Sequence, residues 1–152
     1  MDSQAISEIA ARTGGQAFIN GRIATITVKP EMLRDACAMV SSIPGLYHLS
    51  TITGIDIGEE IELQYHFWKE REFVSVRTMV GKQSPQLRTV SDVLPSAILY
   101  EAEVHDMLGV LFQGNALMGR KLLLPDNYPK DAPPPLRKEA NPEEIRRLMG
   151  LE

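Results

Sequence analysis

The 152-residue chain contains a single cysteine, Cys37, and this scarcity excludes two kinds of site. A disulfide needs two cysteines, and an iron–sulfur cluster typically needs about four cysteine ligands. Cys37 shares helical spacing with Leu33, Ala36 and Val40, so we expect a buried structural thiol. The sequence therefore predicts neither a disulfide nor an iron–sulfur cluster within this chain.

Long apolar runs, excess positive charge and metal-ligand spacings are also missing. No apolar run approaches the roughly 20 residues of a membrane-spanning helix. The net charge of −4 predicts no nucleic-acid partner. The three histidines, His48, His66 and His105, form none of the paired spacings typical of zinc sites. We therefore expect no metal and no cofactor in this chain.

Periodic apolar positions predict an α+β core domain over residues 1–110, with a mainly antiparallel sheet packed with helices. Helices are expected over residues 3–13, 30–43 and 95–108, and strands over 46–56, 61–68 and 73–80, with a loop over 81–92. The dipeptide Asn20-Gly21 predicts a hairpin turn in which both residues take positive φ.

The helix before Gly109 is acidic and does not divide into one apolar and one polar face. Tyr100, Val104, Met107 and Leu108 share one apolar arc, and Ile98 and Ala102 lie on a second arc. One arc can pack against the core of the domain. We expect the other arc to be covered by something other than this core. The carboxylates between the arcs need donors, for which the basic candidates are Arg120, Lys121, Arg71, Arg77 and Arg88.

The segment after this helix is rich in proline and leucine. Residues 111–140 are expected to form an extended arm, because Pro133-Pro134-Pro135 favours extended backbone and Leu122-Leu123-Leu124 has too few neighbours for a core of its own. Asn141-Pro142-Glu143-Glu144 then predicts a short C-terminal helix over 141–152. The leucines of the arm indicate a segment that lies on a partner.

Several motifs in order resemble one known family, the 30-kDa subunit of NADH:quinone oxidoreductase, respiratory complex I, and its equivalent in energy-converting membrane-bound hydrogenases. The motifs are Glu101, Glu103, Asp106 and Gly109, then Arg120-Lys121-Leu122-Leu123-Leu124-Pro125, then Pro135-Leu136-Arg137-Lys138. The chain departs from the usual pattern at Ala102, Leu108 and Asn115-Ala116, which favours a divergent branch such as a ferredoxin-linked hydrogenase subunit.

The resemblance implies a cofactor-free hydrophilic subunit of a membrane-associated redox complex, with no catalytic residues of its own, that supports electron transfer coupled to ion translocation. Its partners would be the large catalytic subunit, of the 49-kDa or hydrogenase type, and a neighbouring iron–sulfur subunit; the clusters, and a nickel–iron centre or quinone, would lie in those partners. The chain would be peripheral, on the cytoplasmic side of the cell membrane. The residues expected at the partner interface are Glu101, Glu103, Asp106, Arg120, Lys121, Leu122, Leu124, Pro135, Leu136, Arg137 and Lys138.

A second interpretation remains open from the residues alone. A small soluble enzyme could use Glu101, Glu103, His105 and Asp106 for acid–base or metal chemistry. That function requires the four side chains to converge on one pocket, and side chains at these positions of a helix point in different directions.

Overall fold

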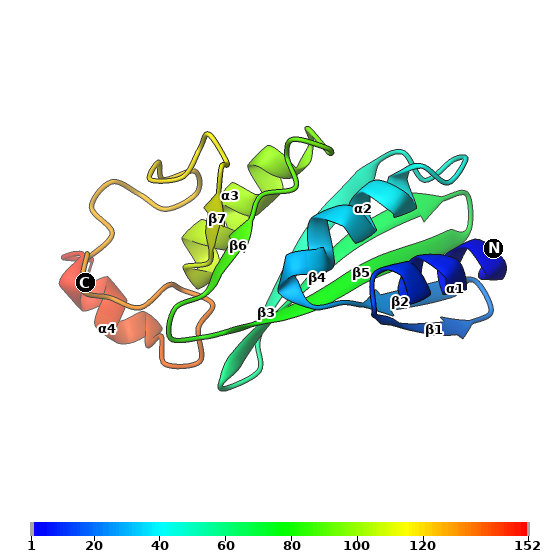
Figure 1. The fold of residues 1–152 in the computed structure, drawn as a ribbon. Helices are drawn as coiled ribbons and strands as arrows, with labels where there is room; N and C mark the ends of the chain where they lie inside the picture. The colour runs from blue at the N-terminus through cyan, green and yellow to red at the C-terminus, as the bar shows by residue number, and fades with distance from the viewer. Residues whose placement is uncertain (1, 152) are drawn as a thin grey trace.

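The structure, a computed structural model, describes residues 2–151 as an α+β fold built on a five-stranded sheet (Figure 1). Its first part comprises α1 (Ser3–Arg12), β1 (Gln16–Asn20), β2 (Ile23–Thr27), the 3-10 turn η1 (Pro30–Met32), α2 (Leu33–Ser41), β3 (Leu49–Asp56), β4 (Glu60–Lys69) and β5 (Glu72–Gly81). Its second part comprises β6 (Gln86–Arg88), α3 (Ala97–Leu108), β7 (Leu111–Gln113) and α4 (Pro142–Leu148).

The five strands lie in the order β1-β2-β5-β4-β3. Three of the four strand pairs are antiparallel, which confirms the expected mainly antiparallel sheet, and the β2–β5 pair is parallel. The parallel pair arises because the chain leaves β2, crosses through α2 and the β3–β4 hairpin, and returns beside β2 as β5. Such crossovers require a connection of a dozen or more residues.

The core lies between one face of this sheet and the helices. Alternation along β4 places Ile61, Leu63, Tyr65 and Phe67 on the core face, and none of these side chains is exposed. On α2 the expected stripe is confirmed, with Leu33, Ala36, Cys37 and Val40 all buried. Burial raises the pKa of the Cys37 thiol, which is consistent with an inert structural cysteine.

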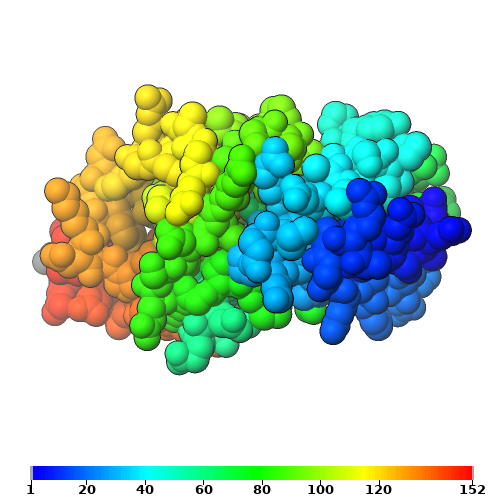
Figure 2. Space-filling model, in the orientation of Figure 1, coloured from blue at the N-terminus to red at the C-terminus, as the bar shows by residue number. Residues whose placement is uncertain are grey.

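The second part of the chain lies at one end of the molecule, away from α1, β1 and β2 (Figures 1 and 2). Helix α3 packs on β3, and the short strands β6 and β7 pair in parallel beside it. Residues 114–140 contain no helix or strand and run along the surface until α4 begins. Among the described residues, no helix is long and apolar enough to cross a membrane.

The structure corrects the sequence-based expectations in three places. The first hairpin turns at Gly21-Arg22, one residue later than expected, because Asn20 still pairs with Ile23 and only Gly21 has a positive φ. The expected loop over 81–92 contains β6, and the expected arm over 111–140 begins with β7. Strands of three residues are too short to give a periodic signal, so only the tertiary pairing reveals them.

Candidate partner-binding site

Helix α3 occupies the position predicted for the acidic helix and ends at Gly109, whose φ of 72° is left-handed. A Cβ at this glycine would lie 3.0 Å from Pro134 Cγ, so the arm also requires a small residue here. The expectation that one apolar arc needs an outside cover is wrong for Ala102, which is fully buried within the chain. The large apolar residue that α3 leaves exposed is Leu99.

Glu101 is fully buried, and its partners are polar groups rather than basic side chains. Its carboxylate accepts hydrogen bonds from Thr89 Oγ1, from the Val90 backbone N–H at 2.8 Å and from Asn115 Nδ2 at 2.8 Å. Burial raises the pKa of Glu101, although these hydrogen bonds act in the opposite direction. The side chain thus holds the β6–α3 loop and the β7 end against α3.

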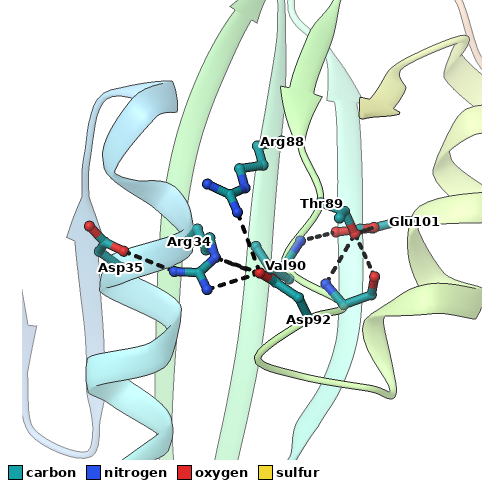
Figure 3. Close-up of polar contacts among 8 residues, drawn as sticks. Arg34, Asp35, Arg88, Thr89, Val90, Asp92 and Glu101 are labelled. Carbon is teal, nitrogen blue, oxygen red and sulfur yellow. Dashed lines mark hydrogen bonds and ion pairs between the residues drawn. The ribbon is translucent and has the colours of Figure 1, made fainter. Parts of the chain in front are cut away.

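A second set of contacts fastens the same loop to α2 (Figure 3). Arg34 on α2 forms an ion pair with Asp92, in which Nε and Nη2 both lie 2.9 Å from Oδ2, and Arg88 reaches the same oxygen at 3.7 Å. Glu101 approaches Thr89 and Val90 from the other side (Figure 3). Two independent elements therefore fix the loop that leads into α3.

Asp106 binds the backbone of the arm at residues 122–124. Its Oδ2 accepts hydrogen bonds from the backbone N–H groups of Leu122, Leu123 and Leu124, at 2.7, 2.7 and 3.2 Å. The expected ion pair with Arg120 or Lys121 is absent among the described residues; Lys121 Nζ instead donates to the carbonyls of Pro125 and Asp126. Consecutive amide groups around one carboxylate form an anion-binding turn of the kind seen in backbone nests.

The far end of the arm is clamped to the β3–β4 turn. Asp56 Oδ2 accepts from the Lys138 backbone N–H at 2.9 Å and pairs with Lys82 Nζ at 2.6 Å, and Lys82 also pairs with Glu139. Burial acts to raise the pKa of Asp56, but the hydrogen bonds from Lys82, Lys138 and Gly58 outweigh it and hold that pKa well below its usual range. A salt-bridged carboxylate thus joins the arm to the sheet.

The arm also closes the C-terminal end of α3. Arg137 Nε donates to the carbonyl of Leu108 at 2.8 Å, and the Leu136 N–H donates to the carbonyl of Met107 at 2.9 Å. The last carbonyls of a helix have no partner within the helix, so these contacts satisfy two of them. The arm is therefore attached to its own domain at two places, residues 122–124 and residues 136–138.

The remaining predicted interface residues differ in exposure. Glu103, Arg120, Lys121, Leu122, Leu136 and Lys138 are exposed, whereas Leu124, Pro135 and Arg137 are half-buried. A pocket of about 390 Å³ lies between the last turn of α3 and the arm. The cationic side chains that line it are Arg120, Lys121 and Lys130. Sequence reasoning missed Thr89 and Asn115, for which only the distance in space to Glu101 gives a signal.

The four side chains of the enzymatic interpretation do not converge. Glu101 is buried, Glu103 is exposed, and Asp106 is occupied by backbone amides. His105 Nδ1 lies 2.9 Å from the carbonyl of Val110. The described residues hold no group of three or more His, Cys, Asp or Glu side chains arranged to bind a metal. This arrangement can organise a binding surface but offers no acid–base pair.

Comparison with known families identifies the chain. Residues 26–145 match the family model described as "Respiratory-chain NADH dehydrogenase, 30 Kd subunit". The chain belongs to this family. Because the match spans β3, α3 and the arm, the contacts of Asp56, Glu101 and Asp106 described above lie within the region that matches the family.

Several relatives are similar over most of this chain. The C subunit of the NADH-quinone oxidoreductase of Roseiflexus castenholzii is 29% identical, over 76% of this chain and 68% of its own length. The C/D subunit of the NADH-quinone oxidoreductase of Phocaeicola vulgatus is 33% identical over 75% of this chain, but only 22% of its own length. The region similar to this chain is therefore a small part of a much longer polypeptide in that protein.

Two solved structures have the same fold. A chain from the membrane-bound sulfane sulfur reductase, an archaeal respiratory membrane complex, aligns with a TM-score of 0.81 and 25% identity, over 95% of this chain and 89% of that one. A trypsin-resistant fragment of Nqo5 aligns with a TM-score of 0.60 and 26% identity, over 76% of this chain and 98% of the fragment. The first of these covers more of the chain.

Proposed function

We propose that this protein is a cofactor-free hydrophilic structural subunit of a membrane-associated respiratory redox complex, either complex I-like or of the energy-converting hydrogenase type. It docks on the large catalytic subunit and lies beside an iron–sulfur subunit. Membership of the 30-kDa subunit family supports the assignment to such a complex. The C/D relative carries a region similar to this chain within one longer polypeptide, which supports a large subunit as the immediate neighbour.

The observation that supports the docking role is that the arm is attached to its own domain by its backbone, whereas several of its side chains are exposed. Carboxylates of the protein's own domain bind the arm through backbone N–H groups, at Asp106 and at Asp56. The side chains of the arm are therefore left free to face outward. Leu122, Leu123 and Leu136 are 43, 55 and 60% exposed, and Arg120 is exposed without an ionic partner among the described residues. Exposed leucines and an arginine on a fixed backbone are typical of a protein interface.

In this role the chain is a structural subunit and carries no redox group. The redox groups, iron–sulfur clusters with a nickel–iron centre or quinone, belong to the partners, and the chain supports electron transfer by holding them in place. It is held at the cytoplasmic side of the cell membrane by the other subunits of the complex. The arm of residues 111–140 supplies the main contact, and the core domain of residues 1–110 supplies the platform on which the arm is fastened.

Purification of the tagged full-length chain from membranes of its source organism tests this function. The wild-type chain is expected to co-purify with a large subunit and with subunits that contain iron–sulfur clusters. The double variant Arg120→Glu/Leu123→Asp should reduce that recovery roughly tenfold, because it removes a cation and an apolar contact at the centre of the interface. Both side chains are exposed, so the isolated variant should remain folded.

A matched double variant, Arg71→Glu/Tyr47→Asp, makes the same kinds of change at exposed positions at the far end of the sheet. We expect it to co-purify as well as the wild type. Recovery of the wild-type chain outside any membrane complex would contradict the proposed function. Full recovery of the Arg120→Glu/Leu123→Asp variant would move the docking surface away from the arm.

A further inference from the structure

Strand β3 is an edge of the five-stranded sheet and pairs on one side only, with β4. Within residues 2–151, no hydrogen bond reaches the outward-facing backbone groups of residues 49–55. Unpaired N–H and C=O groups along a strand are a template for the addition of another strand. This edge lies next to α3 and the end of the arm.

A groove of about 280 Å³ follows this edge. It is lined by Thr51, Ile52, Thr53 and Gly54, four consecutive residues of β3. Side chains of alternate residues in a strand point to opposite faces of the sheet. A groove that touches all four residues must therefore open at the edge of the strand, where both faces are accessible.

The opposite wall of the groove is α3. Val104, Met107 and Leu108 line it, and Leu136 of the arm closes one side with 60% of its surface exposed. Glu103 also lines the groove, is exposed, and has no ionic partner among the residues that the structure describes. An edge strand beside a helix, with apolar side chains between them, is the arrangement by which some domains bind extended peptides.

We propose that the β3 edge receives an extended segment of a neighbouring subunit as an additional strand of the sheet. The segment places an apolar side chain between Val104 and Met107 and a Lys or Arg side chain against Glu103. The unpaired carboxylate selects a basic residue by charge complementarity, and the free backbone groups of β3 select an extended conformation. This inference rests on the proposed function, and it adds a second contact, continuous with the arm at Leu136.

A second copy of this chain fits the groove less well than a larger partner does. Stable interfaces bury about 800 Å² on each partner, and the edge of one eight-residue strand beside a groove of this size falls well short of that area. A segment of a subunit that is already held by the arm needs no such area, because attachment through the arm raises its effective concentration.

The single buried cysteine allows a direct test. Because Cys37 is fully buried, Thr51→Cys introduces one reactive thiol at the edge of β3, and a photoreactive benzophenone maleimide can be attached to it in the full-length chain. After assembly in membranes of the source organism, illumination is expected to join the probe to one extended peptide of one partner subunit. That peptide should alternate apolar residues and contain a Lys or Arg. Ala17→Cys, an exposed position on β1 at the opposite edge of the sheet, should not capture it.

The carboxylate is tested by combining Thr51→Cys with Glu103→Lys. This reversal should lower the yield of the adduct about fivefold, the effect of an exposed ion pair near the upper end of its usual range. Glu70→Lys makes the same charge change at an exposed position in the β4–β5 turn and should leave the yield unchanged. If Thr51→Cys fails to fold, Ile55→Cys offers a second exposed position on the same strand.

The outcomes separate this inference from the proposed function. A tagged chain that co-purifies with its complex but gives no peptide adduct at Thr51→Cys would overturn the inference alone. An adduct with a second copy of the chain, or with lipid, would overturn it as well. A tagged chain found outside any membrane complex would overturn both.

Discussion

The sheet body (residues 3–81) and the arm region (residues 82–151) are stabilised in different ways. The sheet body is stabilised by ladder hydrogen bonds, with β4 and β5 pairing over ten residues each, and by most of the apolar core, to which α3 adds Val104 and Leu108. The arm region has the helices α3 and α4, two three-residue strands and a long segment without regular structure. Outside these elements, buried acidic side chains bind parts of its backbone: Glu101 and Asp106 on α3, and Asp56 at the edge of the sheet.

This difference shows how a chain without repeating structure can satisfy its backbone. Buried N–H groups need an acceptor, which a helix or sheet supplies from its own carbonyls. In the arm region Glu101 accepts from Val90, Asp106 from residues 122–124, and Asp56 from Lys138. Each carboxylate therefore takes the place of a missing strand partner, and its removal should affect a defined stretch of chain.

The largest expected effect comes from Glu101→Ala. It leaves the Val90 N–H without its acceptor in a fully buried place, removes one of the two acceptors of the Asn115 amide and opens a cavity, so the free energy of unfolding should fall by about 3–5 kcal/mol. Chemical denaturation followed by circular dichroism measures this change. Glu103→Ala is the control on the same helix and should change the stability by less than about 0.5 kcal/mol, because Glu103 is exposed. Equal effects of the two variants would refute the distinction between the buried and the exposed carboxylate.

A smaller effect, dependent on pH, is expected from Asp56→Asn. The pKa of Asp56 is lower in the folded protein than in the unfolded chain, so its contribution is complete above about pH 4, the ordinary value for Asp, and decreases as the pH falls toward the folded pKa. At neutral pH the variant should lose about 1.5–3 kcal/mol, the contribution of hydrogen bonds to a charged group.

The loss in Asp56→Asn should shrink as the pH is lowered below about 4, because the wild-type carboxylate is then protonated as well. Denaturation curves at a series of pH values measure the difference between the two proteins. Asp131→Asn provides the control, since Asp131 is an exposed aspartate of the arm. A constant difference across this pH range would show that the Asp56 charge does not hold the arm.

The smallest effect on global stability is expected from Asp106→Asn, because the contacts of Asp106 reach only the arm. The amides of residues 122–124 should exchange with solvent roughly ten to a hundred times faster, since the charged acceptor is weakened. Amides of β4, such as that of Tyr65, should exchange at the wild-type rate. Hydrogen exchange followed by mass spectrometry or NMR gives both values, and a uniform increase along the chain would show that the two regions unfold together.

Much of the sheet body could be predicted from the sequence. Alternation over residues 61–68 predicted β4, the 3.6-residue spacing of Leu33, Ala36, Cys37 and Val40 predicted α2, and the capping pattern at Asn141 predicted α4. Each of these signals is local, because it depends on which face of a regular element is buried. The same reasoning failed for β6 and β7, whose pairing joins residues 86–88 to residues 111–113.

The same distinction between local signals and tertiary contacts applies to the candidate site. The sequence alone identified the acidic helix, the basic pair, the leucine run and the Pro135-Leu136-Arg137-Lys138 segment as the informative residues. It paired the carboxylates with the wrong donors, because the choice among distant arginines, hydroxyls and backbone amides depends on distances in space. The tertiary structure decided that Glu101 binds Thr89, Val90 and Asn115, and that Asp106 and Asp56 bind the arm by its backbone. Local periodicity determined the elements of this protein, and only their packing decided which polar groups satisfy one another, because a buried hydrogen bond joins whatever the fold brings within about 3 Å.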